Sequence, residues 1–191
     1  MAKIYIYGAS GHGLVVADIA RAVGYDEIVF LDDVSDMKFS PNLPKTDIII
    51  AIGSNKTREI LQNRVEESGF NVVSLVHPSA VISPSAVIER GVVVMPKSVI
   101  NAKALIKCGA IINTGAVIEH ECVIGEFAHI SPNAALAGNV KVGARTHIGI
   151  GSSVIQGVSI GKDCTIGAGS VVVRDLPDSI TAYGVSARVK S

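Results

Sequence analysis

The feature that most constrains this chain is a six-residue repeat in its C-terminal half. From Val76 to Val172 every sixth residue is Val, Ile or Leu, seventeen positions in succession without an exception. Four residues after each position from Val76 to Ile166 comes a small side chain, such as Ala80, Cys122 or Ser170. Large and small inward residues at this spacing are typical of a parallel β-helix, in which three six-residue faces close one coil. The repeat predicts about five such coils, stacked about 4.8 Å apart.

The third residue after each aliphatic position is expected to form the corner between two faces. Gly, Asn and Asp are frequent there, as at Gly91, Gly109, Asn133 and Asp163, and these residues tolerate a positive φ. No insertion interrupts the repeat, which excludes a version of this fold whose site lies on a long inserted arm.

The outward-facing residues of the first coils are also apolar. This row directly precedes the inward positions and consists of Val81, Val87, Val93, Val99, Leu105, Ile111, Val117 and Val123. Single valines on a sheet tolerate solvent, but eight in succession favour a surface that is covered by a second copy of the chain or by another domain.

Residues 1–75 follow a different pattern, in which apolar runs of strand length alternate with segments of helical spacing. The expected strands are 3–7, 27–31, 47–52 and 71–75, and the expected helices are 14–23 and 56–68. This β-α-β-β-α-β order predicts a small Rossmann-like parallel sheet. The predicted fold class is α/β plus all-β, with the Rossmann-like domain at 1–75, the β-helix at 76–178 and a C-terminal tail at 179–191.

Charge and composition narrow the class of partner. The 17 Lys and Arg residues balance the 17 Asp and Glu residues, which argues against a protein that neutralises nucleic-acid phosphate or docks on anionic lipid. The N-terminus leads into a strand without the apolar segment of a signal peptide, and the three cysteines form no Cys-x-x-Cys pair. We expect a cytoplasmic protein with small-molecule partners, no nucleic acid and no membrane insertion.

The turn after the first strand is a candidate nucleotide-sugar site. Gly8, Ser10, Gly11 and His12 lie in a glycine-rich turn that opens a helix, so its backbone N–H groups can bind phosphate. The spacing Gly8-x-x-Gly11-x-Gly13 differs from the dinucleotide fingerprint, and a purely structural turn is the alternative. His12 either contacts a phosphate or caps the helix.

Two carboxylates and a second glycine complete the candidate substrate-binding residues. Asp32 and Asp33 end the second strand, where a carboxylate can accept hydrogen bonds from a ribose or a base. The alternative is a solvated Asx turn. Gly53 lies in the turn that follows the third strand.

His120 is the candidate catalytic base. Glu119 and Glu121 flank it at a predicted corner, where a carboxylate can orient the ring and raise its basicity. Gly138 comes 18 residues later, so it occupies the same corner one coil above. A corner glycine offers a bare backbone N–H beside the base, as acyl transfer requires for its oxyanion. The alternative is an inert surface histidine.

His129 and His147 are also 18 residues apart, and we expect them to stack on one outer face. Stacked imidazoles can bind a metal ion. However, the metal-dependent hydratases built on this fold, the gamma-class carbonic anhydrases, place two ligands five residues apart on one chain, and no histidine pair here has that spacing. We therefore expect no metal.

Several longer stretches resemble a known family. They are residues 4–13, 30–33 and 51–53 and, above all, Asn113-Thr114 followed by 117–127. On these stretches the chain resembles bacterial sugar acyltransferases of the sialic-acid O-acetyltransferase type, and most closely the N-acetyltransferases of bacterial glycan synthesis that act on UDP-linked amino sugars. The similarity covers essentially the whole chain. It implies a left-handed β-helix and a homotrimer.

The resemblance also implies roles for residues of this sequence. His120 matches the family's base, and Glu121 matches the residue that increases its basicity. The residues implied to contact acetyl-CoA are His129, Ile150, Gly167 and Ala168. The C-terminal segment 183–188 resembles the family's ending, with Ser186 in place of a proline.

The resulting hypothesis is an acetyl-CoA-dependent N-acetyltransferase. The resemblance implies that it acts on the 4-amino group of a UDP-linked 2-acetamido-4-amino-trideoxy sugar, by direct attack on the thioester. A sugar O-acetyltransferase of the sialic-acid type is the main rival hypothesis, because the residues do not distinguish an amine from a hydroxyl acceptor. A metal-dependent hydratase is disfavoured by the histidine spacing, and the phosphate-binding turn argues against a non-catalytic spacer.

Overall fold

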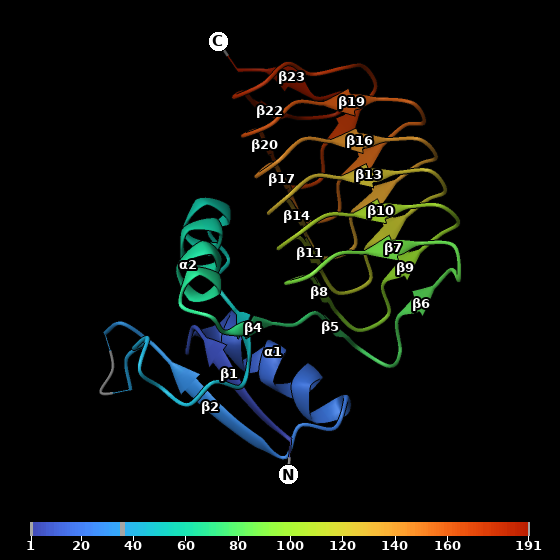
Figure 1. Cartoon of the computed structure of the whole chain (residues 1–191). Coiled ribbons are helices and arrows are strands. Elements are labelled where there is room, and N and C mark those ends of the chain that lie inside the picture. The colour runs from blue at the N-terminus through green and yellow to red at the C-terminus, as the bar shows by residue number, and fades with distance from the viewer. Residues whose placement is uncertain (1, 35–36, 191) are drawn as a thin grey trace.

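The computed structural model describes residues 2–34 and 37–190. A small sheet domain lies at one end of the molecule and a long β-helix at the other, with the two termini at opposite ends (Figure 1). Within these two described ranges, no helix is long and apolar enough to cross a membrane.

The N-terminal domain is a four-stranded parallel sheet in the order β2-β1-β3-β4. Its elements are β1 (Lys3–Tyr7), α1 (Gly11–Ala22), β2 (Glu27–Leu31), β3 (Asp47–Ile50), α2 (Asn55–Glu67) and β4 (Asn71–Val72). The predicted β-α-β-β-α-β order is confirmed. Helix α1 begins three residues earlier than predicted, because Ser10 already has the extended backbone of an N-cap residue.

Three parallel sheets form the faces of the β-helix, as the repeat predicted. Face 1 contains β5 (Leu75–Val76), β8 (Val93–Val94), β11 (Ile111–Ile112), β14 (His129–Ile130), β17 (His147–Ile148), β20 (Thr165–Ile166) and β22 (Thr181–Tyr183), with β23 (Arg188–Val189) added antiparallel. Face 2 contains β6 (Val81–Ile82), β9 (Val99–Ile100), β12 (Val117–Ile118), β15 (Ala135–Leu136), β18 (Ser153–Val154) and β21 (Val171–Val172). Face 3 contains β7 (Val87–Ile88), β10 (Leu105–Ile106), β13 (Val123–Ile124), β16 (Lys141–Val142) and β19 (Ser159–Ile160).

The interior and the corners follow the two phases of the repeat. Aliphatic residues such as Ile118 and small residues such as Cys122 are completely buried in one continuous core. From Gly91 to Gly169 the corner residues have positive φ, and Glu121 at φ 60° is among them. Strand β22 extends face 1 beyond the last repeated residue, so the stack is longer than the repeat alone predicts.

The domain boundaries predicted from the sequence, after residue 75 and after residue 178, stay a prediction.

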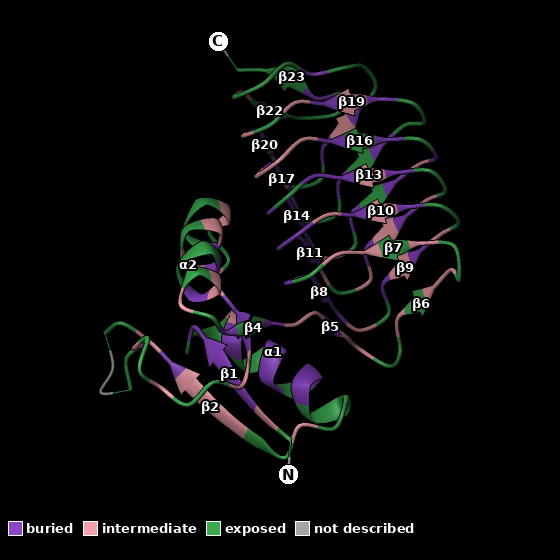
Figure 2. Ribbon diagram, viewed as in Figure 1, coloured by how far each residue is buried: buried purple, intermediate pink, exposed green. Residues whose placement is uncertain are grey.

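The apolar outward row divides between two environments. Val93 and Ile111 on face 1 are buried in one cluster with residues of β1 and α1. Val81 on face 2 and Val87 on face 3 are 63% and 54% exposed, as the colours of β6 and β7 show (Figure 2). Domain packing therefore explains the row on face 1. On faces 2 and 3 of a single chain the first residues of the row are exposed, and the later ones, Val99, Leu105, Val117 and Val123, are partly buried.

Arg58 of α2 is buried where the two halves meet, with 1% of its surface exposed. Its guanidinium donates to the carbonyl oxygens of Gly109 (2.8 Å) and Phe127 (2.6 Å) on the β-helix. On the sheet domain it donates to Ile52 O (2.9 Å) and Asn55 Oδ1 (2.8 Å). Burial lowers the pKa of Arg58 to about 9, so the group stays charged at neutral pH, and main-chain dipoles stabilise its charge.

Replacing Arg58 is expected to weaken this junction. Arg58→Met leaves the carbonyls of Gly109 and Phe127 buried without a donor, which should lower the free energy of unfolding by about 2–4 kcal/mol. Urea unfolding followed by circular dichroism measures the change. The matched control is Arg21→Met, since Arg21 is exposed and pairs only with Asp18, and we expect a change within about 0.5 kcal/mol. Equal stability of the two variants would contradict the prediction.

Candidate active site

His120 lies at the corner between β12 and β13, with 58% of its side chain exposed. Its Nδ1 is 3.2 Å from Oε2 of Glu121, and its backbone N–H donates to Oε2 of Glu119 at 3.3 Å. Because a carboxylate only accepts hydrogen bonds, Nδ1 of His120 carries the donated proton and Nε2 keeps its lone pair. The structure thus brings His120 and Glu121 together as the sequence predicted. The Glu121 carboxylate bonds to the His120 ring, and the Glu119 carboxylate bonds to the His120 backbone N–H.

Gly138 lies beside the free nitrogen of this ring. A Cβ added to Gly138 would lie 2.5 Å from both Cε1 and Nε2 of His120, so only glycine leaves room for the imidazole in this position. Among residues 2–34 and 37–190, no acceptor is found for the Gly138 N–H. A base and an open main-chain donor at one corner can accept a proton from a nucleophile and stabilise a developing oxyanion.

His129 lies elsewhere in the chain, on face 1, and only 8% of its surface is exposed. It pairs in register with His147 on the next coil, and the two ring centroids are 4.8 Å apart, which confirms the predicted stacking. Burial and then His147 lower the pKa of His129 to about 3, so the ring is neutral. His120 is at a corner between faces 2 and 3, so one chain does not bring the two histidines together. No metal-binding group of three His, Cys, Asp or Glu residues exists within the described ranges.

The glycine turn joins β1 to α1. Gly8 has φ +127°, and a Cβ there would lie 2.5 Å from Ala51 O, so the turn requires glycine at this position. Gly11, by contrast, has open space where a Cβ would be, and Ser10 makes no side-chain cap bond to the helix. The hydroxyl of Ser10 and the first N–H groups of α1 are therefore available to an anionic ligand.

A cavity of about 170 Å³ adjoins this turn. The residues that line it are Tyr7, Gly8, Asp32, Asp33, Ile52, Thr57 and Leu61. Asp32 accepts from the backbone N–H groups of Ala9 (3.3 Å) and Val34 (3.0 Å), and Asp33 accepts from the Tyr7 hydroxyl at 2.6 Å. Asp32 therefore does form the Asx turn that was the alternative interpretation, while both carboxylates also face a cavity of the size of a nucleobase.

The two remaining substrate candidates lie on either side of Arg58. The Gly53 carbonyl accepts from its guanidinium at 3.3 Å, and the Gly53 Cα faces open space. His12 is packed against the β-helix, with its ring centroid 6.4 Å from that of His129. Burial, followed by the charge of Arg58, lowers the pKa of His12 to about 4.

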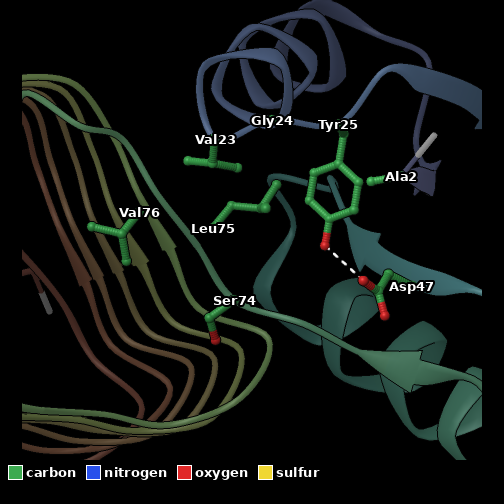
Figure 3. A pocket seen from close by; sticks show the side chains of 8 residues that line it. All are labelled: Ala2, Val23, Gly24, Tyr25, Asp47, Ser74, Leu75 and Val76. Atoms are coloured by element: carbon green, nitrogen blue, oxygen red, sulfur yellow. Dashed lines mark hydrogen bonds between the residues drawn. The ribbon is translucent and has the colours of Figure 1, made fainter.

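A second cavity, of about 360 Å³, lies at the opposite ends of β1 and β3 (Figure 3). Its polar side chains are already bonded within the chain. The Tyr25 hydroxyl donates to Asp47 at 2.7 Å, Asn71 donates to the other oxygen of Asp47, and the Ser74 hydroxyl donates to Glu89 O at 2.7 Å. This cavity therefore offers a ligand less free hydrogen-bonding capacity than the glycine turn does.

Comparison with known proteins identifies the family. Residues 3–65 match the PglD N-terminal domain, and residues 139–174 match six repeats of the bacterial transferase hexapeptide. A variant of the GDP-perosamine N-acetyltransferase from Caulobacter crescentus, solved with CoA and GDP-perosamine, is 40% identical over 100% of this chain and 98% of its own, with a TM-score of 0.96. The chain belongs to the sugar N-acetyltransferase family.

Two further relatives are similar to this acetyltransferase. The acetyltransferase domain of PglB from Neisseria gonorrhoeae FA1090, in complex with acetyl coenzyme A, is 40% identical over 98% of each chain, with a TM-score of 0.92. The UDP-N-acetylbacillosamine N-acetyltransferase of Bacillus subtilis (strain 168) is 36% identical over 108 residues, which are 48% of this chain and 50% of that relative's length. The acetyl donor of the family is acetyl-CoA.

Three of the four predicted coenzyme residues of the acetyltransferase, Ile150, Gly167 and Ala168, lie at one corner between faces 1 and 2, whereas His129 lies on a strand of face 1. Ile150 is 53% exposed there, and its carbonyl accepts from Gly169 N at 2.8 Å. Gly167 and the exposed Ala168 lie one coil above. Face 2 runs from this corner to the corner of His120. A groove of about 410 Å³ on face 2 is lined by Val117, Glu119, Ala135, Leu136, Ala137, Ser153, Val154, Ile155 and Gln156.

The sequence analysis missed two residues that organise the site. Arg58 has no sequence signal, because α2 contains a second arginine, Arg64, in an equally polar context and Arg64 is half exposed. Asn113 donates from Nδ2 to the His129 ring at 2.9 Å. Its spacing of 16 from His129 places it two residues beyond Ile111, the strand position aligned with His129, and this offset could have suggested a contact.

Gly138→Ala tests the close approach of Gly138 to the catalytic candidate. The added methyl group overlaps the imidazole, so the His120 ring must rotate away from Glu121. We expect kcat to fall by about 10²-fold or more, the scale of lost general-base assistance, with the melting temperature nearly unchanged because this corner is at the surface. Ala102→Ser, at the equivalent exposed corner one coil before His120, is the control. Wild-type turnover in Gly138→Ala would show that the ring position is not required.

Proposed function

We propose that this enzyme transfers the acetyl group of acetyl-CoA to the 4-amino group of a UDP-linked 2-acetamido-4-amino-trideoxy sugar. The observation that carries the proposal is the corner of His120, where Glu121 binds one ring nitrogen and Gly138, whose N–H has no acceptor within the described residues, lies beside the other. Membership of the sugar N-acetyltransferase family supports an amine acceptor over the hydroxyl of a sialic acid. The bacillosamine relative supports the UDP sugar.

The reaction proceeds by direct attack in this proposal. Nε2 of His120 takes a proton from the sugar amine as the nitrogen bonds to the thioester carbonyl carbon. Glu121 stabilises the imidazolium that forms, and the Gly138 N–H donates to the tetrahedral oxyanion. Collapse of the intermediate breaks the C–S bond, and the proton held on His120 passes to the departing thiolate to give CoA and the amide.

The acceptor binds to the sheet domain in this proposal. The first N–H groups of α1, at Gly11 and His12, and the Ser10 hydroxyl bind the diphosphate, because a helix N-terminus attracts anions. Asp32 and Asp33 bind the ribose or the base in the adjoining cavity, and Gly53 lets the chain approach the ligand from the second turn.

A GDP-linked amino sugar is the second candidate acceptor. It is favoured by the similarity to the GDP-perosamine enzyme, which extends over the whole chain rather than half of it. The cavity beside Asp32 and Asp33 presents carboxylate acceptors, and guanine has more N–H donors on its pairing edge than uracil has.

The proposal includes a homotrimer. Faces 2 and 3 carry the uncovered apolar row, and His120 lies at the corner between them, where a neighbouring chain would complete the site. A site that combines His120 with His129 would then draw on two subunits. Acetyl-CoA is placed along the groove of face 2, from Ile150, Gly167 and Ala168 towards His120. We place the enzyme in the cytoplasm, consistent with three buried free cysteines.

A substrate panel tests the acceptor. With purified enzyme and acetyl-CoA, thiol release should be fastest with the UDP-linked 4-amino sugar and absent with its 4-hydroxy counterpart, since the base is placed to activate an amine. The panel also contains GDP-perosamine and a free sialic acid. If GDP-perosamine is acetylated faster than the UDP-linked sugar, the acceptor is the GDP-linked amino sugar instead. Acetylation of sialic acid alone would overturn the N-acetyltransferase proposal.

Variants of the base test the mechanism. His120→Ala should lower kcat by about 10²–10⁴-fold while binding of the nucleotide sugar, measured by calorimetry, is retained because that site lies in the sheet domain. Glu121→Gln should have a smaller effect, because it acts through the ring. The control is His77→Ala, since the His77 ring bonds to Ser79 in the junction, away from the corner of His120. If His120→Ala keeps near-normal turnover as a folded protein, the base lies elsewhere.

A charge on the uncovered face tests the trimer. Light scattering at micromolar concentration should give three times the mass of the chain. Val99→Glu, on face 2, should give a monomer with turnover reduced at least tenfold, because burying the carboxylate is unfavourable. Thr165→Glu, at an exposed position of face 1, is the matched control. A wild-type monomer with full activity would exclude the inter-subunit site.

A further inference from the structure

Two buried histidine nitrogens without a partner lie on neighbouring rings at the contact between α1 and β14. They are Nε2 of His12 and Nδ1 of His129, and neither has a hydrogen-bond partner within residues 2–34 and 37–190. His129 is more than nine-tenths buried, and the two ring centroids are 6.4 Å apart with the planes tilted by 46°. That separation leaves the two nitrogens beyond direct hydrogen-bond reach. Two buried polar atoms without partners on neighbouring rings are unfavourable unless a third group satisfies both.

The hydrogen bonds of Asn113 determine which nitrogen of His129 carries the proton. The backbone N–H of Thr114 donates to Oδ1 of Asn113 at 2.8 Å, so the amide oxygen is the acceptor there and Nδ2 is the group that faces His129. Nδ2 donates to Nε2 of His129 at 2.9 Å. A neutral imidazole has one donor and one acceptor nitrogen, so Nδ1 of His129 carries the proton. It is a buried donor that requires an acceptor.

His12 can supply the other half of the link. Its ring is neutral because burial lowers its pKa to about 4, so Nε2 can accept a hydrogen bond when the proton is on Nδ1. The neighbouring rings do not compete for these atoms, because Nε2 of His147 is already paired with the Ser131 hydroxyl at 2.8 Å. A water molecule accepts from one group and donates to another, and buried waters occupy such positions between otherwise unsatisfied groups.

We propose that a buried water molecule bridges Nδ1 of His129 and Nε2 of His12, and that His12 is thereby a positioning residue for His129. The water accepts from His129 and donates to His12. Together with Asn113 on the far nitrogen, it holds the His129 ring in one tautomer and one orientation. If the proposed function is right, this link connects the turn that binds the nucleotide to a histidine that contacts the acetyl donor.

A crystal structure at high resolution tests the link directly and needs no substrate. The expected result is a water within about 3.2 Å of both nitrogens in the ligand-free protein. A dry gap, a direct contact between the rings or an ion in this position would overturn the proposal. Nitrogen-15 NMR of the histidine rings is the second direct measurement. It should show His129 protonated at Nδ1 only, and protonation at Nε2 would equally overturn the proposal.

Paired substitutions separate positioning from packing. His12→Leu removes the acceptor, so His129 should lose its single tautomer in the NMR spectrum, and kcat should fall about tenfold, the scale of one buried hydrogen bond, with KM for the nucleotide sugar nearly unchanged. His12→Gln places an amide near the former Nε2 and should restore both the single tautomer and most of kcat. His77→Leu is the control.

The outcomes distinguish this inference from the proposed function. An unaltered His129 spectrum in His12→Leu, or a Gln variant as impaired as the Leu variant, would overturn the positioning role. Should His12→Leu fail to fold, the crystal structure and spectrum of wild type and His12→Gln decide the matter. If no nucleotide sugar is a substrate, the proposed function fails, but the water and the tautomer are still decided by the crystal structure and the NMR spectrum.

Discussion

A single buried guanidinium, that of Arg58, joins the two halves of this acetyltransferase. A charge buried in this way is unfavourable unless its donors are matched, and here main-chain carbonyls from both halves match them. Because carbonyl positions are set by the backbone, the guanidinium holds the turn at Ile52 and the coil at Phe127 at a defined separation. The second turn of the sheet domain, at Ile52, and the coil that carries His129 consequently keep a constant relation to each other.

The stacked coils convert sequence spacing into spatial proximity. Residues 18 apart lie on adjacent coils, which is why Gly138 touches the ring of His120 and His129 stacks on His147. Glu121 has the same positive φ as the other corner residues of the β-helix. In this backbone conformation its carboxylate reaches Nδ1 of His120. A regular scaffold therefore brings a candidate base, its carboxylate partner and an unpaired main-chain donor together without any inserted loop.

The three faces of the β-helix serve different purposes although their repeats are alike. Face 1 is covered by α1 and the sheet in its lower coils, where outward residues such as Ile111 join the domain core. Faces 2 and 3 keep outward apolar residues in contact with solvent, as at Val81 and Val87. The candidate base lies at the corner where these two faces meet, away from the domain that holds the glycine turn.

The local and periodic features of this protein could be predicted from the order of its residues. The six-residue repeat, the β-α-β-β-α-β order and the pairing of His120 with Gly138 could all be predicted, because each depends on a regular spacing along the chain. The role of Arg58, the burial of His12 against His129 and the bond from Asn113 could not. These depend on how two independently patterned segments pack, and burial at such a contact is decided by the shapes of both surfaces. A polar residue on a helix has the same local sequence signature whether it faces water or carbonyl groups of another domain, so only the tertiary structure distinguishes Arg58 from Arg64.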